Sequence, residues 1–210
     1  DTAAPVVTLQ TWYRVGSRNE RPGKTGMAHL FEHLMFNRTK TLAPGEFDRL
    51  IERTGGDSNA ATWVDWTYYR DTVPAKHLEL VIRLEADRMQ NLTLDDAEIA
   101  SERDVVANER MQRVDDDLDG FLDEELFRLA FRDHSYHWPT IGWMEDIRGF
   151  TKSDCEGFYR RHYAPNNATL VLVGDFAEAD ALSQIENNFG DMASVTIAAP
   201  EITAEPPQDD

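Results

Sequence analysis

The chain has 210 residues, 41% of them apolar and 29% charged, which is enough to bury one sizeable core in a globular domain. Its 21 basic and 39 acidic residues give a net charge of −18, which argues against nucleic acid and anionic membranes as partners because both attract a basic surface. The one cysteine, Cys155, excludes an intrachain disulfide, and no apolar run approaches the length of a membrane span.

The first predicted element is a strand over residues 6–15, where β-branched and aromatic residues alternate with others. The residues before it contain no basic stretch followed by an apolar one, so an export signal has either been removed or never existed. The compartment therefore stays open. We favour the bacterial periplasm or another exported location, with the cytoplasm as the alternative.

The next element is a helix that begins near Thr25 and covers residues 26–36. Apolar side chains surround it almost completely, which predicts burial. His29 and His33 lie four residues apart and project from one face, with Glu32 beside them. Two imidazoles suit zinc, and an adjacent carboxylate can accept a proton from a water molecule. The alternative is a pair of core histidines satisfied by hydrogen bonds, but the combined pattern His-x-x-Glu-His favours the metal.

The next predicted elements are a short helix over residues 44–53 and a strand pair over residues 57–63 and 66–73. Gly55-Gly56 breaks the chain between the helix and the first of these strands. From the residues alone, the pair is either an ordinary hairpin with a glycine bulge or a strand at the edge of a sheet. An edge strand has unpaired backbone donors and acceptors, so it can bind an extended peptide.

Two further helices are predicted, one over residues 74–91 and one that begins near Thr93, with Thr93 or Asp95 as its cap. In the second helix, Glu102 and Glu109 fall on one face two turns apart. They form either part of a site or a solvated helix face.

The acidic run at residues 115–117 is expected to be a solvated junction between helices, because it lacks the residue pattern of a calcium loop. A helix with an apolar face is predicted over residues 121–131. We expect His134 and His137, in the loop that follows, to be structural.

The last predicted elements are a helix over residues 151–163, a strand over residues 168–174 and a helix that ends near residue 188. The helix is expected to bury Cys155 as a small core residue. The strand is the most apolar in the chain, which predicts a central place in the sheet. Beyond residue 195 the chain is rich in Ala, Pro, Glu and Asp, which is typical of a linker.

Taken together, these segments resemble the pitrilysin or insulinase-type zinc peptidases, the inverzincins of the M16 type, which include mitochondrial processing peptidase and many bacterial relatives. The stretch His29–Phe36 is similar to the signature of that family, and further blocks resemble it in the same order along the chain. These blocks are residues 55–62 (GGDSNAAT), 73–74 (VP), 85–89 (EADRM), 102–109 (ERDVVANE) and 163–168 (YAPNNA).

The resemblance implies the composition of a catalytic site. Its members would be the metal ligands His29, His33 and Glu109, the catalytic base Glu32, the supporting residue Glu102, and the substrate-binding edge strand Asn59-Ala60-Ala61-Thr62. In this family the last glutamate of the distal block binds the metal, and the earlier one assists it. Asn108 departs from a glutamate that is common there, which weakens the acidic surroundings of the site.

The resemblance also implies an α+β fold, with helices layered on a mixed, largely antiparallel sheet, as one clamshell domain of the mitochondrial-processing-peptidase-like metallohydrolases. We expect a catalytic domain over residues 1–191, lacking the first strand of the family, and an acidic, Pro-rich linker over residues 192–210. The expected function is a zinc-dependent endopeptidase with one zinc ion and peptide substrates, completed by a second homologous domain or subunit. The alternative is a non-catalytic peptide-binding subunit or fragment, and we expect the isolated chain to be weakly active or inactive.

Overall fold

A four-stranded sheet forms the centre of the computed structural model, which describes residues 3–197, 199 and 202–208. The strands lie in the order β2-β3-β1-β4, and each neighbouring pair is antiparallel. Their bounds are Val6–Tyr13 for β1, Asp57–Thr62 for β2, Thr67–Pro74 for β3 and Ala168–Gly174 for β4. The α+β fold is confirmed, although within the described residues the sheet has no parallel pair.

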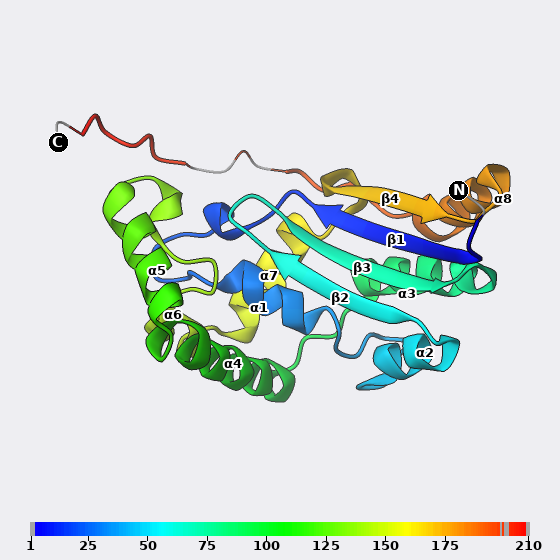
Figure 1. The fold of residues 1–210 in the computed structure, drawn as a ribbon, viewed down its shortest axis with the longest axis horizontal. Coiled ribbons are helices and arrows are strands. Elements are labelled where there is room, and N and C mark those ends of the chain that lie inside the picture. The colour runs from blue at the N-terminus through cyan, green and yellow to red at the C-terminus, as the bar shows by residue number, and fades with distance from the viewer. Residues whose placement is uncertain (1–2, 198, 200–201, 209–210) are drawn as a thin grey trace.

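Helices precede and follow the strands much as the sequence predicts (Figure 1). Their bounds are Met27–Leu34 for α1, Glu46–Thr54 for α2, Leu78–Asn91 for α3, Asp96–Arg110 for α4, Leu118–Ala130 for α5, Met144–Arg148 for α6, Lys152–His162 for α7 and Glu178–Phe189 for α8. Asp95 caps α4 by accepting a hydrogen bond from the backbone of Glu98, one of the two caps expected there. The acidic residues 115–117 form the junction between the π-helical turn η3 (Met111–Asp115) and α5, as predicted.

The helices pack on one face of the sheet, because alternate residues of the central strands point in opposite directions. In β1, Val7, Leu9 and Tyr13 are buried, whereas the intervening Thr8 and Trp12 are only half-buried on the opposite face. The same alternation runs through β3. The core therefore lies between the sheet and the helices and leaves the other face of the sheet open.

The strand that the sequence places in the centre of the sheet, β4, lies at one edge of it. It pairs only with β1 among the described strands, and the side chains of Val171 and Val173 on its open face are 38% and 62% exposed. The prediction was wrong because valine favours any pleated backbone position and does not report how many strands flank it.

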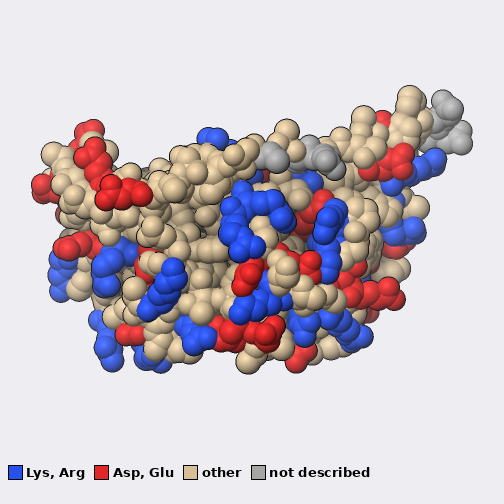
Figure 2. Space-filling model, turned by 180° about the vertical axis from the view of Figure 1, so that it is seen from behind, with Lys and Arg blue, Asp and Glu red and all other residues tan. Residues whose placement is uncertain are grey.

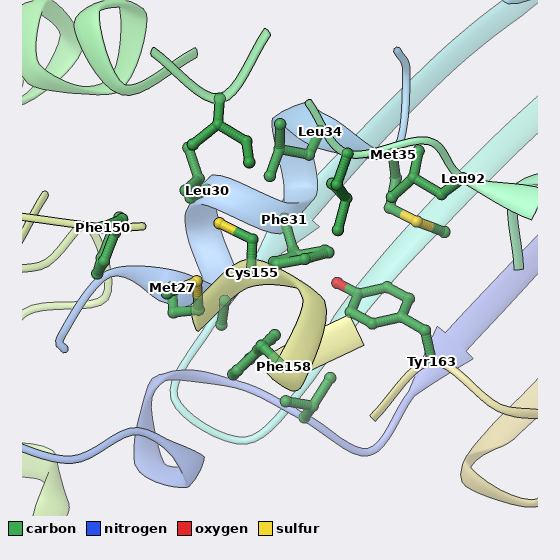
Figure 3. Packing of buried hydrophobic residues seen from close by; sticks show 14 of the residues in the cluster. Met27, Leu30, Phe31, Leu34, Met35, Leu92, Phe150, Cys155, Phe158 and Tyr163 are labelled. Atoms are coloured by element: carbon green, nitrogen blue, oxygen red, sulfur yellow. The ribbon is translucent and has the colours of Figure 1, made fainter. Parts of the chain in front are cut away.

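Helix α1 is at the centre of the larger of the two buried clusters (Figure 3). Leu30 and Phe31 are completely buried, and Phe31 packs against Phe158 of α7 and against Tyr163. Burial of each such side chain stabilises the fold by about 1.5–3 kcal/mol. Cys155 of α7 is likewise buried in this cluster, as predicted.

The C-terminal segment has neither helix nor strand in its described part beyond α8. The expected linker over residues 192–210 includes residues 198, 200–201 and 209–210, which lie outside the described residues, as do residues 1–2. Among the described helices, none combines the length and the apolar composition needed to cross a bilayer.

Candidate metal centre and substrate cleft

The start of α1 is held by two carboxylates, one from the loop that precedes the helix and one from α6. Glu20 accepts hydrogen bonds from the backbone N–H groups of Gly26 and Ala28 at 2.8 and 2.7 Å, and Asp146 accepts from the backbone and hydroxyl of Thr25 at 3.0 and 2.6 Å. Burial raises the pKa of Glu20 well above its usual value, while these N–H groups act to lower it. The sequence did not reveal this role, because a loop separates Glu20 from the helix and no local spacing rule connects them.

Two glycines bring the segment before α6 against the start of α1. Gly26 and Gly142 both have left-handed backbone angles, with φ of 89° and 87°. A Cβ atom on Gly26 would lie 2.4 Å from the carbonyl oxygen of Ile141, and one on Gly142 would lie 2.4 Å from that of Thr25. Only glycine fits at both positions, and the close approach carries residues 139–141 to the edge of the site.

Helix α1 presents its two histidines to α4, where Glu109 meets both of them. The Oε2 atom of Glu109 lies 3.6 Å from Nε2 of His29 and 3.3 Å from Nε2 of His33. Ligand atoms that surround a tetrahedral zinc ion at about 2.0–2.2 Å lie about 3.3–3.6 Å from one another. The two measured distances thus fit a zinc ion, and the donor set of two imidazoles and one carboxylate is one that zinc accepts.

Glu102 lies on the same face of α4 as Glu109 but contacts the other ring nitrogen of His33. Its Oε2 atom is 3.6 Å from Nδ1 of His33, and its other oxygen accepts a hydrogen bond from Asn37 at 3.3 Å. A carboxylate at Nδ1 orients the ring and leaves Nε2 free to point at an ion. In the described structure, Nδ1 of His29 has no such partner.

The charges of these groups are set by burial and by one another. Burial, followed by the neighbouring His33, lowers the pKa of His29 to about 4. Burial also acts to lower the pKa of His33, but Glu102 and Glu109 outweigh it and raise this pKa to about 9. Pairing with His33 lowers the pKa of both carboxylates, so they are ionised at neutral pH, which is the form that binds a cation.

Glu32 lies beside this group on α1 and faces a cleft. Burial raises its pKa, whereas the hydroxyl of Thr62 and the ring of His33 act to lower it. A cation bound nearby would lower the pKa further. The side chain of Glu32 is half-buried and lies close to the candidate metal ligands and to β2.

The cleft has a volume of about 520 Å³ and is bordered by three parts of the chain. His29, Glu32 and Glu109 form one border, and residues 59–64 at the end of β2 form the second. The third border comprises α5, through Gly120, Asp123, Glu124 and Phe127, and residues 138–141. All four residues of the expected edge strand, Asn59 to Thr62, therefore line the same cleft as His29, Glu32 and Glu109.

Strand β2 is an edge strand in the described sheet, because it pairs only with β3. The backbone groups on its other side face no further strand of the described sheet. The sequence left open whether this segment was an ordinary hairpin or an edge strand. The structure has both, since β2 and β3 form a hairpin whose first strand is the edge.

The remaining histidines take no part in the centre. Nδ1 of His134 accepts a hydrogen bond from the backbone of Tyr136, and Nδ1 of His137 lies 2.7 Å from the carbonyl oxygen of Phe131. Both are structural, as predicted. Within the described residues, His29, His33 and Glu109 form the one group of three His, Cys, Asp or Glu side chains close enough to share an ion.

Comparison with known proteins agrees with this geometry. Residues 1–142 match the family described as insulinase (peptidase family M16), and residues 149–210 match the one described as the peptidase M16 inactive domain. The zinc protease PqqE of Helicobacter pylori is 43% identical over 170 residues, and the human mitochondrial-processing peptidase subunit beta is 30% identical over 207 residues. These matches cover 81% and 99% of this chain but only 38% and 42% of the relatives.

The fold matches as well. The crystal structure of a protease from Helicobacter pylori superimposes with a TM-score of 0.94 at 38% identity, over 98% of this chain and 50% of that one. The chain thus spans half of that protein, or somewhat less than half of the two relatives. On both the sequence and the structural matches, the chain belongs to the insulinase family of peptidases, family M16.

Proposed function

We propose that the chain is the zinc-binding catalytic part of an endopeptidase that hydrolyses peptides or unfolded protein segments. The observation that carries this proposal is the meeting of His29, His33 and Glu109 at the border of the cleft that Glu32 faces. The membership in family M16 supports it, as does the description of PqqE as a zinc protease.

His29, His33 and Glu109 would hold one zinc ion, and Glu102 would orient His33. When bound, zinc polarises a carbonyl group and acidifies a water molecule, so that hydrolysis proceeds at neutral pH. Glu32 accepts the proton of the attacking water and passes it to the leaving amine, as a general base and then a general acid.

Residues Asn59, Ala60, Ala61 and Thr62 bind the substrate as an added strand. The peptide pairs with the free side of β2, where backbone hydrogen bonds hold it with little dependence on its sequence. This pairing is supported by the position of β2, which is at the edge of the sheet and borders the cleft that contains Glu32.

A second homologous domain or subunit completes the substrate chamber. The solved relative is about twice as long as this chain, which covers 50% of it. Residues 1–191 would then be the catalytic domain, and the residues from 192 onward the connection to the second half. Because misplacement of a substrate by about 1 Å can cost about a hundredfold in rate, one half alone is expected to cleave slowly.

A binding protein is the second candidate. A chain that holds peptides along β2 without cutting them would use the same edge strand. The incomplete coverage of the relatives favours this reading for the isolated chain, while the complete set of His29, His33, Glu32 and Glu109 favours catalysis.

The test compares the chain with its Glu32→Gln variant. Each is dialysed against zinc, and its zinc content is measured by elemental analysis. A quenched fluorescent peptide then reports cleavage with and without a second M16 half added in trans. We expect about one zinc per chain in both proteins, slow cleavage by the chain alone, faster cleavage with the second half, and no cleavage by the variant in either case.

Each arm of this test can fail separately. Near-normal turnover by Glu32→Gln would remove Glu32 from the role of base. Full zinc content without cleavage, even with the second half present, would favour the peptide-binding candidate. Equal turnover with and without the second half would contradict the two-half chamber.

A further inference from the structure

A carboxylate from the C-terminal segment is bound by three consecutive backbone N–H groups just after α5. Glu205 accepts from Arg132 at 2.9 Å with each oxygen, and from Asp133 and His134 at 3.0 Å each. Successive backbone N–H groups that converge in this way form a concave anion-binding site. Although desolvation acts to raise the pKa of Glu205, these N–H groups lower it to about 2.

A second side chain from the same segment completes the contact. The amide of Gln208 donates to the backbone carbonyl of Ala130, the last residue of α5, at 2.8 Å, and to Glu205 at 2.7 Å. The last carbonyls of a helix have no partner within the helix, so this bond satisfies a group that would otherwise need water.

The two prolines between Glu205 and Gln208 favour a backbone conformation that suits this contact. Pro206 and Pro207 favour the polyproline II conformation, which has three residues per turn. Glu205 and Gln208 are three residues apart and therefore project from the same side of such a segment. One supplies acceptors and the other a donor, which match the donors at residues 132–134 and the acceptor at Ala130.

The residues just before Glu205 also lie against the domain, on the side opposite to the view of Figure 1. Ile202 and Thr203 line a hollow of about 950 Å³ together with Phe158 and Arg161 of α7. On this side of the molecule, Lys and Arg side chains are interspersed with Asp and Glu side chains (Figure 2). The described residues 202–208 run beyond this hollow toward the end of α5 (Figure 1).

The place of contact lies between two segments that border the substrate cleft. Helix α5 contributes Asp123 and Phe127 to the cleft, and residues 138–141 border it after the next turn. Along its length, α5 is tied to α4 by the paired hydrogen bonds between Arg110 and Glu124. A contact at residues 130–134 therefore holds the end of one cleft wall.

We propose that residues 130–134 form a docking site for the segment Glu205-Pro206-Pro207-Gln208 of the same chain, and that this docking holds α5 as a wall of the cleft. The segment is then a strap that links the C-terminal part of the chain to the cleft. The docking stands independently of the proposed function, and only its effect on substrate rests on that function.

The test of the docking uses hydrogen exchange in the 210-residue chain. Glu205→Gln is nearly isosteric but replaces one acceptor by a donor that faces N–H groups. We expect the amides of Arg132, Asp133 and His134 to exchange about tenfold faster or more, which corresponds to the loss of one charge-assisted bond. Glu186→Gln, an exposed side chain on α8, is the matched control and should change none of them. Unchanged protection in Glu205→Gln would overturn the docking.

A second variant tests the role of the prolines, and a second readout tests the cleft. Pro206→Gly with Pro207→Gly keeps both binding side chains and should give a smaller acceleration at the same three amides. Zinc content should stay unchanged in all variants. In the two-half assay, Glu205→Gln should raise KM for the fluorescent peptide severalfold with little change in kcat. An unchanged KM, with the amides exposed, would overturn the coupling to the cleft and leave the assignment of the metal centre untouched.

Discussion

Helices α1 and α5 are both rich in apolar residues, yet they have opposite environments. Five of the eight residues of α1 are buried, whereas α5 has thirteen residues and none of them is buried. The outer face of α5 exposes Leu118 by 71%, Leu122 by 53%, Leu126 by 63% and Leu129 by 63%. The candidate metal ligands His29 and His33 thus lie on an element enclosed by the core, and one wall of the cleft lies on an element attached at a few points.

The attachments differ in kind as well as in number. Helix α1 is held at its start by Glu20 and Asp146, and at its end the hydroxyl of Tyr69 donates to the carbonyl of Phe31 at 3.0 Å. Helix α5 is attached by the pair Arg110–Glu124, by the ring contact between Phe127 and Trp63, and by its contact with the C-terminal segment. Candidate metal ligands that must keep a geometry within a few tenths of an ångström need the first environment, whereas a cleft wall that holds no ligand does not.

The two helices should differ most in their effect on zinc binding, because α1 carries two of the candidate metal ligands. Loss of a hydrogen bond that supports a metal ligand weakens metal binding by about 10–100-fold. His33→Ala on α1 should weaken zinc binding by more than this, because it removes a candidate ligand itself. Asp123→Ala on α5, which lines the same cleft, should leave zinc binding unchanged. Competition with a chromophoric chelator measures both affinities. Full zinc content in His33→Ala would place the site elsewhere.

The same substitution in the two helices compares their environments directly. Leu30→Ala in α1 should lower the free energy of unfolding by about 2–5 kcal/mol, because it leaves a cavity in a closed core. Leu126→Ala in α5 should change it by no more than about 0.5 kcal/mol, because the side chain is already largely in water. Urea unfolding followed by circular dichroism measures both. A large loss of stability in Leu126→Ala would show that α5 is packed in solution.

A finer test concerns the support behind the ligands. Glu102→Gln should weaken zinc binding by about 10–100-fold, because the amide no longer offers a charged acceptor to Nδ1 of His33. Asp104→Asn, an exposed residue on the same helix, is the control and should have no effect. The chelator competition used for His33→Ala measures both variants at one pH. An unchanged affinity in Glu102→Gln would reduce Glu102 to a residue of the helix surface.

Much of the site was predictable because it depends on local periodicity. The spacing of His29, Glu32 and His33 places them together on any α-helix, and Glu102 and Glu109 share a face of α4 for the same reason. The hairpin of β2 and β3 follows from the two glycines between α2 and β2 and from the alternating residues that follow. The role of each residue remains a proposal, but the meeting of His29, His33 and Glu109 at the border of the cleft is a feature of the structure.

Other features could not be predicted from the sequence. The valines of β4 suggested a central strand, yet the strand lies at an edge, and the apolar face expected for α5 is largely exposed. In both cases the composition of a segment shows which secondary structure and polarity its side chains favour. It does not show which other segments pack against it. Glu20 lies in the loop before α1, and Glu205 binds the backbone of Arg132, 73 residues earlier in the chain, so no periodic pattern reveals either contact.

The amino-acid sequence by itself determined the elements of this protein and which side chains share a face of each, because these depend on the repeat of the helix and the strand. Only the tertiary structure decided that Glu109 meets His29 and His33, that β4 lies at an edge of the sheet, and that Glu205 binds the backbone just after α5. These outcomes depend on the packing of segments that are far apart in the chain, which is a property of the whole core rather than of any one segment.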